Sequence, residues 1–198
     1  MFRACLQEVL QYEGAYSNHK SDFGGETYKG ISRFYHADWD GWEIVDMAKE
    51  RYGGLAALKR GDVTEVLGSA YQHKLQQLVA LFYKEEFWDR VRGDELAAID
   101  GDLACEVFDI AVNMGVRQAG KLLQKAINHF ALPHIAEDGV IGEQTLGALT
   151  LVRLSGNIKA LVVVLQKLRA LHYATIVANN PSQAVFLRGW IKRALKIS

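Results

Sequence analysis

Two carboxylates stand close together near the start of the chain, in the stretch YEGAYSNHKSDFGGETYKGIS (residues 12–32). Glu13 comes where an amphipathic helical pattern gives way to turn residues, and Asp22 lies among those turn residues. Two carboxylates facing one cleft are the usual minimum for glycoside hydrolysis, in which one protonates the bridging oxygen and the other positions water or attacks the sugar. Glu13 and Asp22 are therefore candidate catalytic residues.

The helical pattern itself points Glu13 toward the core. The apolar spacing predicts a helix over residues 2–12, and Glu13 follows Val9 by four residues on the same stripe. An apolar wall disfavours the charged form of a carboxylic acid, and a glutamate that stays protonated can donate a proton to a leaving group. The alternative is a glutamate at the edge of the core that pairs with Arg3, Lys20 or Lys29.

The residues after Glu13 admit both catalytic and structural interpretations. Asp22 is a common turn former, while Gly24 and Gly25 permit positive φ and let a polymeric ligand approach the backbone. Thr27 would hold a water molecule with its hydroxyl or simply cap the next turn. Spacing alone leaves these alternatives open.

Composition and charge exclude several other classes of function. The chain of 198 residues balances 23 basic against 23 acidic residues, which gives no argument for nucleic acid or an anionic membrane as a partner. The histidines and the two cysteines show no metal-ligand spacing, and no phosphate-binding glycine loop occurs, so we expect neither metal nor cofactor. The longest uninterrupted apolar run, residues 160–165, is too short for stable membrane insertion.

Apolar spacings of three and four residues, with only two prolines, predict an all-α fold. Residues 17–30 are rich in turn formers and predict at most a small hairpin, followed by a short helix near residues 31–36. A helix over residues 157–179 would bury Leu161, Leu165, Leu168 and His172. A polar stretch near residues 90–101 divides the chain into regions 1–93 and 94–198, which we expect to pack as one compact body.

The opening stretch resembles glycoside hydrolase family 108, a group of lysozyme-like N-acetylmuramidases also described as secretion activators. The matching residues are Glu13, Gly14, Tyr16, Asn18, Asp22, Gly24, Gly25, Thr27, Gly30 and Ile31. The departures are Ala15, Phe23, Tyr28 and Ser32, none of which removes an acid. The stretches FDIAVNMG (108–115), LLQKAIN (122–128), DGVIGEQTL (138–146) and FLRGWIKR (186–193) resemble the peptidoglycan-binding region of that family, whereas residues 33–70 carry no recognised motif.

The resemblance implies a lysozyme-like fold and cleavage of the β-1,4 bond between N-acetylmuramic acid and N-acetylglucosamine, with Glu13 as the general acid. It implies catalytic roles for Asp22 and Thr27 as well, although four residues separate them here and five separate the similar pair in phage lysozymes. The substrate-binding residues that it implies are Tyr16, Asn18, Gly24, Gly25 and Asn113.

Two other functions stay open beside hydrolysis. A lytic transglycosylase would use a single glutamate and no water, and a non-catalytic wall-binding or secretion-accessory protein would act through residues 102–198. In each case the expected partner is bacterial peptidoglycan. The start of the chain lacks the apolar core of a Sec signal, so we expect synthesis in the cytoplasm, release through a holin or an export apparatus, and action in the periplasm or cell wall.

Overall fold

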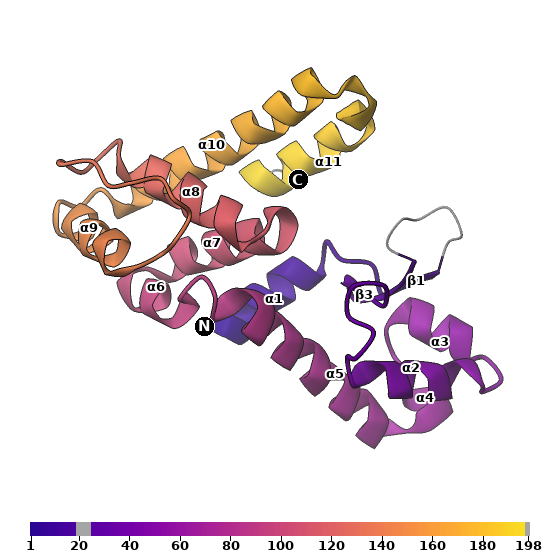
Figure 1. Ribbon diagram of the computed structural model, residues 1–198. Coiled ribbons are helices and arrows are strands. Elements are labelled where there is room, and N and C mark those ends of the chain that lie inside the picture. The colour runs from indigo at the N-terminus through magenta and orange to yellow at the C-terminus, as the bar shows by residue number, and fades with distance from the viewer. Residues whose placement is uncertain (19–24, 197–198) are drawn as a thin grey trace. The chain divides into compact units, whose positions relative to one another are not determined.

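The computed structural model describes residues 1–18 and 25–196, and most of these residues lie in helices (Figure 1). This confirms the mainly α fold predicted from the apolar spacing. The chain divides into two compact units, one of residues 3–86 and the other of residues 1–2 with 87–198.

The unit of residues 3–86 contains the small sheet. β1 (Tyr16–Asn18) pairs with β2 (Glu26–Tyr28), and β2 pairs with β3 (Ile31–Ser32), both antiparallel. The expected hairpin is thus present and gains a third strand, so the helix predicted near residues 31–36 was wrong. The helices of this unit are α1 (Phe2–Leu10), α2 (Gly41–Lys49), α3 (Gly54–Arg60), α4 (Thr64–Leu67) and α5 (Ser69–Tyr83).

α1 ends at Leu10, two residues before the predicted end. The backbone N–H of Tyr12 donates to the carbonyl of Val9 over 3.0 Å, a tighter spacing than the α-helical one, which closes the last turn. Cys5, Leu6 and Val9 form its buried face. Glu13 therefore lies in the bend beyond the helix and not on the helical stripe itself.

The two residues between β2 and β3 form a tight hairpin turn. Lys29 has a φ of 48° and Gly30 a φ of 81°, and the flanking Tyr28 and Ile31 are paired. Positive φ at both central positions is the requirement of a type I′ turn, whose twist matches the strands that it joins. Glycine adopts this conformation freely, whereas a lysine is strained there.

The unit of residues 87–198 is helical throughout its regular elements. Its start overlaps a π-helical turn, η1 (Lys84–Trp88). The remaining elements are α6 (Gly93–Ile99), α7 (Gly101–Met114), α8 (Val116–Ile127), α9 (Glu143–Leu154), α10 (Ile158–Asn179), the short η2 (Pro181–Gln183) and α11 (Ala184–Leu195). α10 and α11 lie side by side as an antiparallel pair (Figure 1).

The buried face of α10 agrees with the predicted one in its first half, at Leu161 and Leu165, and departs from it in the second half. Its buried residues are Leu161, Leu165, Arg169 and Tyr173, so the stripe runs at intervals of four and admits a charged side chain. Leu168 and His172, which the apolar pattern had placed in the core, are only half-buried. By length and composition alone α10 would suffice to cross a membrane, a test that the core helix of a soluble protein also passes.

Candidate active site

The carboxylate of Glu13 lies against the β2–β3 turn. A Cβ placed on Gly30 would be 2.8 Å from Oε2 of Glu13 and 2.6 Å from the hydroxyl oxygen of Tyr83. Real Cβ atoms do not approach other atoms so closely, so any side chain here would displace Glu13 or Tyr83, and the φ of 81° strains every residue except glycine. The missing side chain of Gly30 thus lets a half-buried carboxylate and a buried phenol reach the same point.

Two hydrogen bonds hold the turn to the segments on either side of it. The backbone N–H of Lys29 donates to the carbonyl of Ala15 over 2.8 Å. The hydroxyl of Tyr83, at the end of α5, donates to the carbonyl of Lys29 over 2.7 Å. The bend that carries Glu13, the turn and α5 are therefore tied together, which is the kind of support that positions a reactive carboxylate.

A second carboxylate of the sheet, Glu26, is fully engaged. It accepts hydrogen bonds from the Tyr16 hydroxyl over 2.8 Å, from Lys49 over 2.7 Å and from Arg33 over 2.8 Å. Burial alone would raise the pKa of Glu26, but the hydrogen bonds from Lys49 and Tyr16 outweigh it and hold the pKa below its ordinary value. Glu26 is thus a fixed anion that ties the sheet to α2, and it is unsuited to donate a proton.

The other predicted site residues of this unit lie along the hairpin. The hydroxyl of Tyr16 is taken up by Glu26, and Asn18 is exposed at the end of β1. Gly25 has a φ of 63° with open space around its Cα, and Thr27 is half-buried in the central strand. Asp22 and Gly24 fall outside the described residues.

Asn113 belongs to the other unit, near the end of α7. Its Oδ1 accepts a hydrogen bond from the hydroxyl of Tyr173 over 2.5 Å, and Nε of Arg169 donates to the same hydroxyl over 3.2 Å. The side chain predicted to bind substrate is therefore joined to a polar network that the sequence did not predict.

That network is buried between α7, α10 and α11. Arg169 is fully buried and donates to Asp109 over 2.5 Å and to Glu106 over 3.2 Å, while Nε of Arg193 donates to Asp109 over 2.8 Å. Burial would lower the pKa of Arg169, but the carboxylates of Asp109 and Glu106 raise it. Burial raises the pKa of Glu106, despite the opposing charge of Arg169.

Metal binding finds no support in the described part of the chain. Among residues 1–18 and 25–196, no group of three or more His, Cys, Asp or Glu side chains is placed to hold an ion. The groups described near Glu13 suit the chemistry of a carboxylate that is held in place by its neighbours.

Two residues of this arrangement had no predicted role. Gly30 is part of the opening pattern, but its neighbours are set by the tertiary fold. Tyr83 lies 54 residues after Lys29, to whose carbonyl it donates a hydrogen bond. In the sequence, nothing distinguishes it from the other aromatic residues of its helix. No local signal would have identified it.

Comparison with known proteins gives two family matches. A family described as Glycosyl hydrolase 108 matches residues 6–115, and one described as Predicted Peptidoglycan domain matches residues 118–195. The solved structure of SagA from Brucella abortus is similar to this chain with a TM-score of 0.61 and 24% identity, covering 98% of this chain and 90% of that one. This likeness supports the mainly α, lysozyme-like fold. No match was found among curated proteins.

Proposed function

This chain belongs to the glycosyl hydrolase 108 family, and from this we propose that it is an N-acetylmuramidase. Its substrate would be the β-1,4 bond between N-acetylmuramic acid and N-acetylglucosamine. The domain over residues 118–195 supports peptidoglycan as the partner. The observation that carries the proposal is the half-buried carboxylate of Glu13, held against Gly30 and Tyr83 by a turn that is anchored on both sides.

In this proposal Glu13 acts as the general acid. It protonates the bridging oxygen while the bond from that oxygen to the anomeric carbon breaks, and water supplies the hydroxyl of the new reducing end. General acid catalysis of this kind contributes about 10² to 10⁴ in rate. Asp22 would direct the water or attack the sugar, and Thr27 would hold the water. Contacts to the glycan would come from Tyr16, Asn18, Gly24, Gly25 and Asn113.

A lytic transglycosylase is the second candidate. It would use Glu13 as its single acid, and Glu26, which three donors occupy, would keep its structural role in the sheet. The product then carries an anhydro-muramic end in place of a reducing end.

We propose the periplasm or cell wall as the place of action, because peptidoglycan lies there. The state of the cysteines supports an oxidising compartment, since neither Cys5 nor Cys105 is a free thiol. Release through a holin or an export apparatus would bring the enzyme to this substrate.

Mass spectrometry of the products from purified cell wall tests the proposed reaction. Hydrolysis gives fragments with reducing muramic ends, which is the expected result. Anhydro-muramic ends would replace this proposal with the transglycosylase. Binding of the chain to the cell wall with no released fragment would indicate a non-catalytic wall-binding protein.

A further inference from the structure

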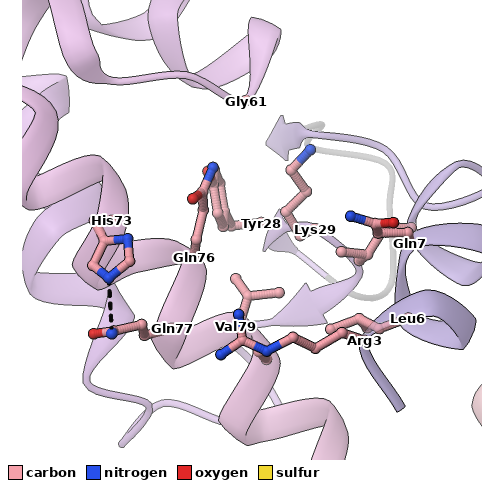
Figure 2. Close-up of a pocket in the computed structure, with 12 residues that line it drawn as sticks. Arg3, Leu6, Gln7, Tyr28, Lys29, Gly61, His73, Gln76, Gln77 and Val79 are labelled. Atoms are coloured by element: carbon pink, nitrogen blue, oxygen red, sulfur yellow. Dashed lines mark hydrogen bonds between the residues drawn. The ribbon is translucent and has the colours of Figure 1, made fainter. Parts of the chain in front are cut away.

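The unit of residues 3–86 contains an open cavity of about 330 Å³ whose lining does not include Glu13. Its floor is apolar, with the buried side chains of Leu6, Tyr28 and Val79. Its rim is polar and comes from α1, the β2–β3 turn and α5 (Figure 2). The polar rim residues are Arg3, Gln7, Lys29, His73, Gln76 and Gln77. A volume of this order suits a small ligand or a short segment of a larger one.

The charge on this rim has one sign. Arg3 and Lys29 are cationic, and no Asp or Glu is among the described residues that line the cavity. Within residues 1–18 and 25–196, neither of these two side chains forms an ion pair, so both cations face the cavity without a partner. A site of this kind attracts an anion, since a carboxylate would complete the charge balance.

Neutral hydrogen-bonding groups surround the two cations. Figure 2 shows Gln7 on the α1 side and Gln76 and Gln77 on the α5 side, where Nε2 of Gln77 lies 2.9 Å from Nε2 of His73. A glutamine amide both donates and accepts, which matches the two polar groups of a peptide bond. Burial and the charge of Asp62 raise the pKa of Tyr28 to about 12, so its hydroxyl stays a donor.

The backbone of Lys29 supplies an independent observation. Its φ of 48° lies in the left-handed region, where glycine and asparagine are found far more often than lysine. Residues held in such a conformation cluster at active sites and ligand clamps. Here the strained turn brings the ammonium group of Lys29 to the cavity.

We propose that this cavity binds the carboxylate of a short acidic peptide, namely the stem peptide that branches from the glycan of peptidoglycan. The inference rests on the proposed function, because it adds a peptide subsite to a glycan-cleaving enzyme. Arg3 and Lys29 pair with the carboxylate, and the glutamines bind the peptide amides. The apolar floor accepts the methyl groups of alanine residues.

Lys29 connects this subsite to the candidate active site. Its side chain lines the cavity, while the next residue, Gly30, packs against the carboxylate of Glu13. The carbonyl of Lys29 is held by Tyr83, so the turn cannot shift without disturbing that contact. A peptide bound at Lys29 therefore stabilises the turn that positions the acid, and peptide-bearing glycan becomes the preferred substrate.

Direct binding of a synthetic stem tetrapeptide to the full chain tests the proposal. The probe is L-Ala-γ-D-Glu-meso-diaminopimelate-D-Ala, and the matched probe is the same peptide with its carboxylates amidated. Calorimetry should show saturable binding of the first and at least roughly tenfold weaker binding of the second, because a charged hydrogen bond is lost. No binding, or equal binding of both peptides, would overturn the proposal.

Variants of the rim assign the binding to this cavity. Arg3→Gln and Lys29→Asn should each weaken binding of the tetrapeptide by about tenfold. Asparagine suits a left-handed turn better than lysine does, so Lys29→Asn should keep or raise the melting temperature, which separates lost binding from lost folding. Lys59→Gln, an exposed lysine of α3 outside the lining, is the control and should bind as the parent does. Unchanged binding in both rim variants would contradict the assignment.

Cleavage assays separate this inference from the proposed function. Arg3→Gln, which lies outside the turn beside Glu13, should raise KM for intact cell wall and leave turnover of peptide-free glycan unchanged. If neither polymer is cleaved by the parent chain, the proposed function fails, while the peptide titration still decides the subsite. If both polymers respond equally to Arg3→Gln, the subsite is wrong and hydrolysis stands.

Discussion

The two units of this protein use charged side chains in opposite ways. In residues 3–86, Arg33 and Lys49 bridge Glu26 and Asp46 at positions that keep contact with solvent. In residues 87–198, Arg169 binds its carboxylates where its side chain is fully buried. The first arrangement joins the sheet to α2, and the second joins α7 to α10.

The two networks differ in how much each ion pair contributes to stability and in how strictly each charge needs a partner. An exposed pair is screened by water and contributes little, so the first unit can hold its sheet without committing every charge. A buried pair must be complete, because a charge left alone in the interior is expensive. Among residues 1–18 and 25–196, Arg3 and Lys29 of the first unit form no ion pair, whereas in the helical unit Arg169 and Arg193 both bind buried carboxylates.

Removing one arginine from each network tests this contrast with the largest expected effect. Arg169→Gln removes the guanidinium that joins Glu106 to Asp109, leaves Arg193 as the partner of Asp109, and should lower the free energy of unfolding by roughly 3–5 kcal/mol. Arg33→Gln, made in the half-exposed network, should cost less than about 1 kcal/mol. Urea denaturation followed by circular dichroism measures both. Equal losses would remove the distinction between the two networks.

A substitution in the turn beside Glu13 should have an intermediate effect on stability. Gly30→Ala adds roughly 1–2 kcal/mol of backbone strain and forces a Cβ against Tyr83 and Glu13, for a further loss of roughly 1–3 kcal/mol. Gly53→Ala is the matched control, since Gly53 has a φ of 77° with nothing within 4 Å of the added Cβ. Only Gly30→Ala should also reduce cell-wall digestion. Equal effects of the two variants would mean that crowding at Glu13 is unimportant.

The smallest expected effect is on the pH dependence of stability, through the carboxylate of Glu26. The pKa of Glu26 lies below its ordinary value of 4.5, so its contribution is present above about pH 4.5 and is lost as the pH falls through the lowered pKa. Glu26→Gln should remove that part of the pH dependence. For a chain of this length, each kcal/mol of stability lost lowers the melting temperature by about 2–4 °C. Glu106 has a raised pKa, so its contribution has the opposite sign: it is fully present below about pH 4.5 and is lost as the pH rises through the raised pKa. Unchanged pH profiles in Glu26→Gln would contradict the assignment of Glu26 as a fixed anion.

Local patterns in the sequence predicted the parts of the fold that depend on neighbours along the chain. Apolar spacing identified the helical class and the start of α1, and turn formers identified the hairpin. The end of α1 was misplaced because Tyr12 closes the helix with a shorter hydrogen bond, a choice that composition does not reveal. The third strand replaced a predicted helix because a type I′ turn at Lys29 and Gly30 reverses the chain there.

Contacts between distant segments account for what the sequence did not predict. Arg169 occupies a core position of α10 because Asp109 and Glu106 of α7 neutralise it, and no spacing rule anticipates a buried charge whose partners lie 60 and 63 residues away. In the same way, Tyr83 reaches the turn beside Glu13 only in the folded chain. The sequence could predict Glu13 as the candidate acid, whereas the contacts that hold the turn beside it form only in the tertiary structure.

The rate of cell-wall cleavage by Glu13→Gln tests the proposed catalytic role most directly. Glutamine keeps the shape of the side chain against Gly30 and removes the proton that a general acid must give. The proposed role predicts a loss of about 10² to 10⁴ in kcat while the circular dichroism spectrum shows the fold of the parent, and the control Glu50→Gln, an exposed residue after α2, keeps full activity. Undiminished cleavage by Glu13→Gln would contradict it.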